Sequence, residues 1–230
     1  MGYYNKTVIC KNMTFEYKYY AVRSSGQKCK GRSENREKTR EGQKQINRKM
    51  SAYKKIWDVC NNFDKGDYWL TLTYRQGERP EDIQTAHKNL KKLMRNVNYF
   101  LKKRGFENVY MGKSERGRKG GLHHHLMIKA YPGLIEYIMK KWDCGKIYID
   151  TAYSENLQQL GEYFAKEDAA AVETLFTASR NLKKPKIVRK KIKAKTFRQD
   201  PPMKKGCVRT HLYNAVYNGY IYQEHFYYKL

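Results

Sequence analysis

The chain has 230 residues, of which 48 are lysine or arginine and 22 are aspartate or glutamate, so its formal net charge is +26. Hydrophobic residues make up 40% of the chain, which is enough for a core and excludes a disordered polycation. A net charge of about 2 to 8 already keeps a small domain soluble, so this surplus indicates a polyanionic partner. Nucleic acid fits best and an anionic membrane surface less well. The 21 tyrosines favour single-stranded nucleic acid, because bases stack on aromatic rings while phosphates need positive charge.

Membrane and secreted classes are disfavoured by the same sequence. No apolar run approaches the length of about 18 residues that a membrane-spanning helix needs, and the first residues lack the apolar segment of a signal peptide. The five cysteines are scattered and form no CxxC pair, which disfavours a zinc knuckle and favours reduced thiols. We therefore expect a cytoplasmic protein with no membrane partner.

Residues 1–62 are predicted to form a basic N-terminal extension. A strand or hairpin is expected near residues 14–22, and a helix of weak amphipathicity from Ser33 toward Val59. Residues 28–55 carry eleven lysines and arginines against three glutamates, a net charge of +8. This helix is either a solvated surface helix or an arm that faces DNA.

Residues 63–180 contain the elements expected to form the folded core. Residues 68–74, rich in aromatic and β-branched side chains, predict a strand, and Pro80 opens a helix whose apolar stripe ends at Gly105. The other elements are a strand at 108–111, a strand at 122–130, a helix at 132–142, a strand at 146–149 and a helix from Ser154 to about Phe176. This β-α-β-β-α-β-α order predicts an α+β fold, an antiparallel sheet with helices packed mainly on one face.

Residues 181–230 are predicted to form a basic, tyrosine-rich C-terminal extension that packs on the core or continues it. The segment 180–210 carries thirteen lysines and arginines against one aspartate, a net charge of +12. It is either a nucleic-acid clamp, which its charge density favours, or a flexible solvated tail. The strand-like stretch 213–228 offers either a stacking platform for bases or ordinary half-buried strand positions.

The sharpest local feature is a run of three histidines, His123 to His125, in the strand predicted for residues 122–130. Since alternate residues of a strand point to opposite faces, His124 is expected to face the apolar core, while His123 and His125 share the other face. The two imidazoles then lie about 7 Å apart at the backbone, close enough to converge on one cation. The alternative is that all three are structural histidines with ordinary hydrogen-bond partners.

Glu115 is a candidate third ligand for that cation. It lies at the end of the preceding strand, and the glycine- and arginine-rich turn at 116–121 brings that strand back beside the histidines. A His/His/Glu set with open positions suits Mn²⁺ or Mg²⁺. Alternatively, Glu115 is a surface acid paired with Arg116 or Arg118.

Tyr163 is the candidate nucleophile. On the helix after Ser154, this residue lies about 90° from the centre of the apolar stripe, with Lys166 one turn further along the same flank. A phenol with a pKa of about 10 is a poor nucleophile at neutral pH, so a metal would have to polarise the scissile phosphate while Lys166 stabilises the developing charge or orients the DNA. Attack by Tyr163 would leave a 5′-phosphotyrosine link and a free 3′-OH, and the strand could later be rejoined.

Three motifs, taken in chain order, resemble the HUH endonucleases, and specifically the rolling-circle replication initiators (Rep proteins) of small phages and plasmids. They are the strand from Trp69 to Tyr74, the run His123-His124-His125 preceded by Glu115, and the helix with Tyr163-x-x-Lys166. The resemblance covers residues 65–180, about half of the chain. Two features depart from the family pattern. The middle position of the histidine run is His124 rather than an aliphatic residue, and no second tyrosine lies one turn from Tyr163, as in single-tyrosine members.

The resemblance implies an RRM-like, ferredoxin-like palm, a divalent metal and nicking of single-stranded or hairpin origin DNA in a bacterial host. It also implies a host helicase and a host polymerase that extends the 3′-OH. The cations expected to bind the DNA are Arg116, Arg118, Lys119, Lys183, Lys184 and Lys186. Two alternatives stay open: a single-tyrosine transposase of the same chemistry, and a non-catalytic RNA- or DNA-binding module with structural histidines.

Overall fold

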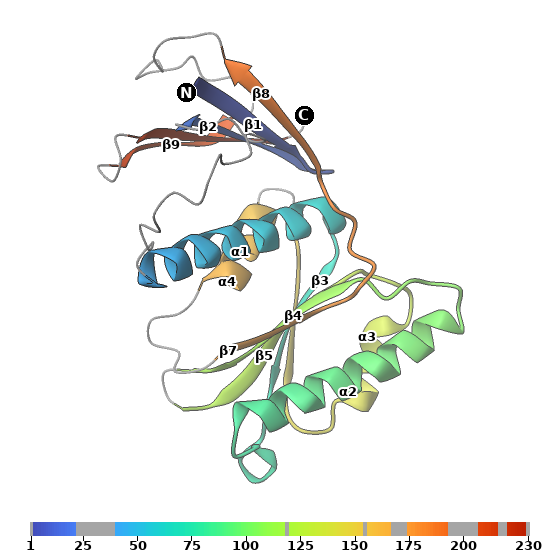
Figure 1. The fold of residues 1–230 in the computed structure, drawn as a ribbon. Helices are drawn as coiled ribbons and strands as arrows, with labels where there is room; N and C mark the ends of the chain where they lie inside the picture. The colour runs from blue at the N-terminus through green and yellow to red at the C-terminus, as the bar shows by residue number, and fades with distance from the viewer. Residues whose placement is uncertain are drawn as a thin grey trace, which may run out of the picture. The chain divides into compact units, whose positions relative to one another are not determined.

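The structure is a computed structural model, drawn in Figure 1, in which the chain forms two compact units. One unit is residues 52–183, and the other combines residues 1–51 with 184–230. The residues that the structure describes are 2–21, 40–117, 120–153, 156–166, 174–192, 207–215 and 220–228. Predictions for residues 22–39 and 193–206, which hold much of the basic charge of both extensions, lie outside this described part.

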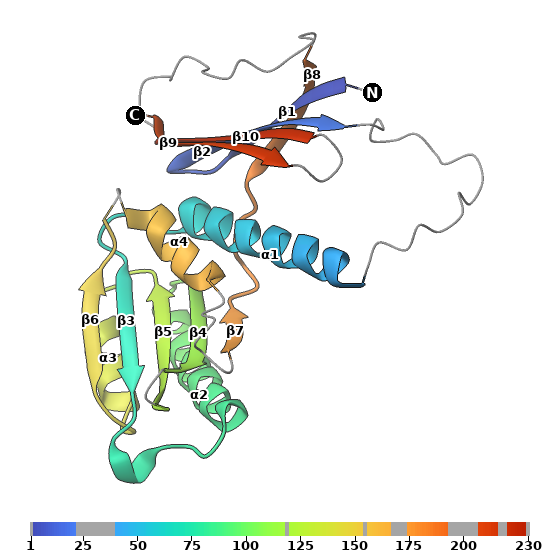
Figure 2. The same ribbon diagram turned by 90° about the vertical axis from the view of Figure 1, so that its left-hand side faces the viewer.

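The unit of residues 52–183 is built on a five-stranded antiparallel sheet in the order β6-β3-β5-β4-β7 (Figure 2). Its strands are β3 (Tyr68–Thr73), β4 (Tyr110–Arg116), β5 (Leu122–Ile128), β6 (Ile147–Thr151) and β7 (Thr174–Ala178). The predicted α+β class, with an antiparallel ferredoxin-like sheet, is confirmed.

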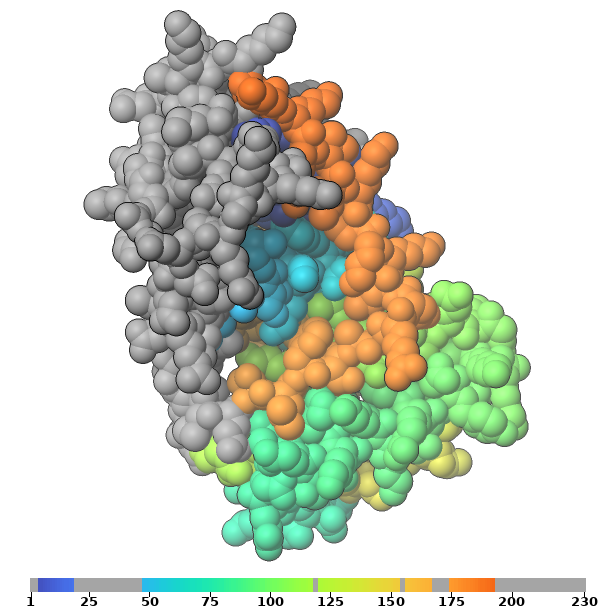
Figure 3. Space-filling view, in the orientation of Figure 1, coloured from blue at the N-terminus to red at the C-terminus, as the bar shows by residue number. Residues whose placement is uncertain are grey.

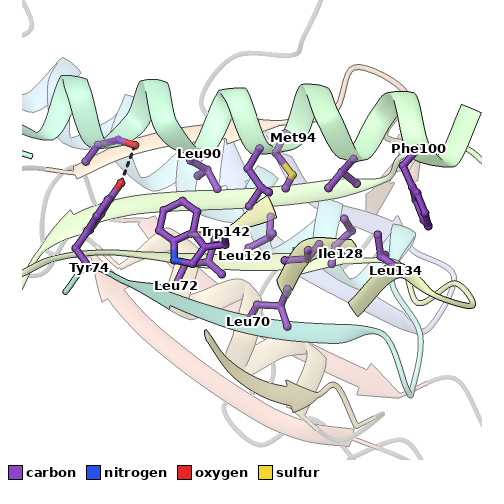
Figure 4. Close-up of a cluster of buried hydrophobic side chains, with 14 of the residues drawn as sticks. Leu70, Leu72, Tyr74, Leu90, Met94, Phe100, Leu126, Ile128, Leu134 and Trp142 are labelled. Atoms are coloured by element: carbon purple, nitrogen blue, oxygen red, sulfur yellow. Dashed lines mark hydrogen bonds between the residues drawn. The ribbon is translucent and has the colours of Figure 1, made fainter. Parts of the chain in front are cut away.

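Helices α2 (Ile83–Lys102) and α3 (Leu134–Lys141) cover one face of this sheet and bury its main apolar core. Figure 4 shows that core, in which Leu70 and Leu72 of β3 meet Leu126 and Ile128 of β5 under α2. The helix predicted to open at Pro80 begins instead at Ile83. Asp82 is its N-cap, because the Asp82 carboxylate accepts a hydrogen bond of 2.7 Å from the backbone N–H of Thr85.

Helix α4 (Leu157–Ala165) lies over the other face of the sheet together with the end of α1 (Arg40–Asn62), as Figures 1 and 2 show. The prediction that the helix after Ser154 runs to Phe176 is wrong. The helix ends at Ala165, Lys166 is extended, and residues 174–178 form β7, which pairs with β4 from Met111↔Ala178 to Glu115↔Thr174. Without β7, β4 would be an edge strand with unpaired backbone N–H and C=O groups. Pairing with β7 gives these groups hydrogen-bond partners, which a longer α4 would not do.

Close contact between α1 and α4 depends on Gly161. A Cβ atom there would lie 2.8 Å from the Cα of Ile56, a backbone atom that cannot move aside alone. We expect Gly161→Ala to destabilise the protein by about 1–3 kcal/mol in urea unfolding, because α4 must shift outward. Gly77→Ala, where nothing lies within 4 Å of the added Cβ, is the matched control and should stay within about 0.5 kcal/mol of the parent. Equal stability of the two variants would contradict this packing.

The second unit is also an antiparallel sheet of five strands, in the order β8-β1-β2-β10-β9. These strands are β1 (Gly2–Ile9), β2 (Met13–Ala21), β8 (Lys186–Ile192), β9 (Cys207–Ala215) and β10 (Tyr220–Tyr228). Strands from the two ends of the chain thus pair with each other, which the sequence did not indicate. The side chains of the tyrosine-rich stretch 213–228 lie outside the described part.

No helix among the described residues is both long enough and apolar enough to cross a bilayer.

Candidate active site

The pleat of β5 separates its three histidines as the alternation predicted. His124 is fully buried on the face toward α2, while His123 and His125 lie half-buried on the opposite face. The strand register then brings partners to each of them: Glu115 of β4 lies opposite His123, and Thr71 of β3 lies opposite His125.

Glu115, His123 and His125 form one cluster, in which one ligand atom from each residue lies within 4.8 Å of the other two. The Oε1 atom of Glu115 lies 2.9 Å from His123 Nε2 and 3.3 Å from His125 Nε2. The remaining ring nitrogens are also engaged, since His123 Nδ1 is 3.3 Å from the Gly121 carbonyl and His125 Nδ1 is 3.2 Å from Thr71 Oγ1. These outer contacts orient both rings so that their Nε2 atoms face the carboxylate.

Tyr163 reaches the same cluster from α4. Its hydroxyl donates a hydrogen bond of 2.9 Å to Glu115 Oε1 and lies 2.6 Å from His125 Nε2. The indole of Trp69 supports this arrangement, because it stacks on the His125 ring at 5.7 Å and meets the Tyr163 ring edge-on at 5.5 Å between centroids. The structure thus brings together the four residues that the sequence singled out as ligands and nucleophile.

The cation beside the cluster is Lys113, which the sequence analysis missed. Its Nζ lies 2.6 Å from Glu115 Oε2 and 5.2 Å from the Tyr163 ring centroid, and it donates to the Lys166 carbonyl at 3.1 Å. Lys166 itself is the residue that follows α4, and its side chain is exposed. The signal that could have found Lys113 is its position two residues before Glu115, which places both side chains on one face of the strand.

The alternative pairing of Glu115 with a neighbouring arginine is not what the structure shows for Arg116. Its guanidinium donates to the carbonyls of Gly120 and Glu81 at 3.3 and 3.1 Å. Arg118 and Lys119 lie outside the described residues. Lys183, Lys184 and Lys186, the other cations predicted to bind DNA, are exposed.

Charge in the cluster is arranged to keep a carboxylate ionised. Burial alone would raise the pKa of Glu115, but hydrogen bonds from His123, His125, Lys113 and Tyr163 hold it well below its ordinary value. The hydrogen bond to Glu115 raises the pKa of His123, whose two ring nitrogens both face acceptors. Burial lowers the pKa of His125. The Lys113 ammonium, 2.6 Å from Glu115 Oε2, therefore neutralises the negative charge of this carboxylate.

His124 belongs to a separate, buried hydrogen-bonded chain under α2. Its Nε2 lies 2.8 Å from the Tyr74 hydroxyl and its Nδ1 lies 2.8 Å from Ser114 Oγ, which is in turn 2.9 Å from His87 Nδ1. Both ring nitrogens therefore have the partners that a core histidine needs. The chain ties β5, β4 and α2 together directly behind the Glu115–His123–His125 cluster.

Acid should destabilise the protein through His124. Burial lowers its pKa to about 3, against about 6.5 in an unfolded chain, so the unfolded state binds the extra proton between these values. The contribution of His124 to the unfolding free energy is therefore complete above about pH 6.5. It decreases by about 1.4 kcal/mol for each unit by which the pH drops below that value. We expect the urea-derived unfolding free energy of His124→Gln to be lower than the parent's at pH 7. Between pH 6 and pH 4 it should decrease less with falling pH than the parent's does. Parallel curves would contradict the assignment.

Comparison with known proteins gives one finding. Residues 67–168, less than half of the chain, match the family model described as replication-associated protein ORF2/G2P. No curated protein and no solved structure matched the chain. The matched segment begins just before β3 and ends just after α4, so it contains Trp69, Lys113, the Glu115–His123–His125 cluster and Tyr163.

Proposed function

We propose that this chain is a replication initiator that nicks single-stranded origin DNA by transesterification through Tyr163, with the help of a divalent metal. The family match supports a replication-associated role. The observation that carries the nicking proposal is the placement of the Tyr163 hydroxyl, 2.9 Å from Glu115 Oε1 and 2.6 Å from His125 Nε2. The Tyr163 hydroxyl is thus in direct contact with two of the three described residues that could hold a metal.

The donor set fits Mn²⁺ or Mg²⁺. One carboxylate and two imidazoles with tied outer nitrogens provide three ligands and leave other positions open for water or phosphate. Glu115, His123 and His125 would hold the ion, and Lys113 neutralises the outer oxygen of the carboxylate. When bound, such an ion supplies Lewis-acid polarisation of the scissile phosphate.

The reaction exchanges one phosphate ester for another. The Tyr163 oxygen attacks phosphorus, forming an Oη–P bond, and the bond from phosphorus to the 3′ oxygen breaks. The phenol proton is lost to water, because Glu115, whose pKa is held well below its ordinary value, is a poor proton acceptor, and the departing 3′ oxygen takes a proton from water. The products are a 5′-phosphotyrosine link and a free 3′-OH for a host polymerase, with a host helicase to unwind the template. The reverse exchange rejoins the strand.

Neighbouring side chains prepare Tyr163 for this attack. Trp69 holds the ring edge-on, so the hydroxyl points at the cluster rather than at solvent. The ammonium of Lys113, 5.2 Å from the ring centroid, is placed to stabilise negative charge as it develops on the phenol. In this respect Lys113 takes the role that the sequence analysis gave to Lys166.

End-labelled single strands test the proposal. The full chain is incubated with Mn²⁺ and a pool of random-sequence single-stranded oligonucleotides, because the origin sequence is unknown. A label at the 3′ end should migrate with the denatured protein, since the 5′ phosphate of the downstream fragment is the linked group. A label at the 5′ end should appear only in shortened free DNA. Binding without any adduct would instead favour the non-catalytic DNA-binding module.

A further inference from the structure

Helix α2 carries a one-sided positive charge that the proposed chemistry does not use. It contains five lysines and arginines and no acid. Four of its cations, Lys88, Lys91, Arg95 and Lys102, fall at spacings of three, four and seven residues and so share one face. Like charges at such spacings repel each other and cost helix stability, whereas a merely solvated helix normally alternates the two signs.

This face of α2 forms one wall of a groove of about 950 Å³. The end of β7 and the turn at residues 179–181 form the opposite wall. Figure 3 shows these residues, in orange, lying directly against the green helix. Arg180 adds a fifth cation to the groove, and none of the described residues that line it is acidic. From Lys88 to Lys102, 14 residues further along the helix, the positive stripe is about 21 Å long, enough to follow several phosphates of one strand.

The groove wall at 179–181 is held in place by hydrogen bonds. Ser179 accepts a hydrogen bond from the Tyr110 backbone N–H at 3.2 Å and returns one from its own N–H to the Tyr110 carbonyl at 3.0 Å. A few residues later, the backbone N–H of Lys183 donates to Asn62 Oδ1 at 2.7 Å. Arg180 is therefore presented by a segment anchored at both ends, which favours binding because less order has to be gained.

Tyr99 adds an aromatic surface to this groove. Its side chain is 61% exposed, and the Lys103 ammonium lies 4.5 Å from the ring centroid. An exposed ring among cations is the combination that binds unpaired bases and their phosphates, whereas a duplex keeps its bases stacked and hidden. The exposed ring therefore favours single-stranded nucleic acid over other anionic ligands for this positively charged groove.

We propose that the groove between α2 and the 179–181 turn is a second binding site for single-stranded DNA. It lies on the α2 side of the sheet, whereas the Glu115–His123–His125 cluster lies on the other face. This second site rests on the proposed function, because nicking of single-stranded origin DNA supplies the strand that the groove would bind. Arg180 and its neighbours would then bind a part of the strand that is remote from the point of cleavage.

Binding of a 30-nucleotide oligo-dT by the full chain tests this site. Fluorescence anisotropy is measured over a range of salt concentrations without added metal and in a Tyr163→Phe background, so that no cleavage contributes. The groove variant is Lys91→Gln, Arg95→Gln and Arg180→Gln. The control, with the same loss of charge on exposed residues of the same unit, is Lys65→Gln, Lys140→Gln and Lys141→Gln.

The groove variant should bind about 10- to 100-fold more weakly at 0.1 M salt, and its log–log salt slope should fall by about 2, at about 0.7 per lost phosphate contact. The control should keep the parent's slope. Tyr99→Leu should weaken binding about tenfold with an unchanged slope, because it removes stacking and no charge. Equal effects of the groove and control variants, or no effect of either, would overturn the inference.

Other outcomes separate this site from its alternatives. The same loss of slope with a duplex of equal length would overturn the single-strand assignment, and a loss seen only with polyglutamate would assign the groove to an acidic protein. The end-label assay, run with Tyr163 intact, keeps the two proposals apart. A reduced slope without any adduct leaves the groove standing and removes the nicking proposal, and an adduct with an unchanged slope does the reverse.

Discussion

Tyr163→Phe is expected to abolish the covalent protein–DNA adduct, with a loss of at least ~10⁴-fold, the scale of removing a nucleophile. The change deletes only the oxygen that would attack phosphorus. The ring keeps its edge-on contact with Trp69, and α4 keeps its buried residues Leu157 and Phe164, so folding and DNA binding should survive. The measurement is the 3′-label that migrates with denatured protein, taken together with oligo-dT affinity.

Tyr148→Phe is the matched control for this experiment. Tyr148 belongs to the same unit, on β6, and its side chain is 59% exposed, so removal of its hydroxyl should leave the adduct unchanged. An adduct that persists in Tyr163→Phe would show that another of the 21 tyrosines is the nucleophile. Loss of the adduct in both variants would point to a general effect on DNA binding, which the affinity measurement would reveal.

The alternation of one strand made much of this site predictable. A run of three histidines in a strand with an apolar face forces His123 and His125 to one side, and a short turn returns Glu115 beside them. Both inferences need only the two-residue period of a strand and the antiparallel geometry of a hairpin. The helical position of Tyr163, beside rather than within the apolar stripe, followed in the same way from the helical period.

Contacts between distant elements were not predictable from these periods. The period of β4 places Lys113 on the same face as Glu115, but Lys113 lies beside Tyr163 only because α4 packs over β4. Local propensity predicts a helix as far as Phe176 where the structure has β7, since the pairing of β7 with β4 is a tertiary contact that local propensity does not record. The pairing of strands from both ends of the chain in one sheet is hidden for the same reason.

Glu115→Gln is expected to remove the metal site while keeping the shape of the side chain. In the parent, Mn²⁺ should raise the thermal midpoint as its concentration rises, because an ion that binds only the folded state stabilises it. The variant should lose this shift, and its yield of adduct should fall by at least ~100-fold. Glu136→Gln, on an exposed position of α3, is the control and should behave as the parent in both measurements.

The same substitution also removes the partner of a buried lysine, and the two effects must be separated. The Lys113 side chain is 5% exposed and its Nζ is 2.6 Å from Glu115 Oε2, so Glu115→Gln leaves that charge buried and should lower metal-free stability by about 3 kcal/mol. Adding Lys113→Met removes the stranded charge. The double variant should recover most of the metal-free stability in urea unfolding, but not the Mn²⁺-dependent rise in thermal midpoint. Recovery of both the stability and the Mn²⁺-dependent rise would mean that Glu115 pairs with Lys113 and binds no metal. Recovery of the stability alone would mean that Glu115 both pairs with Lys113 and binds the metal.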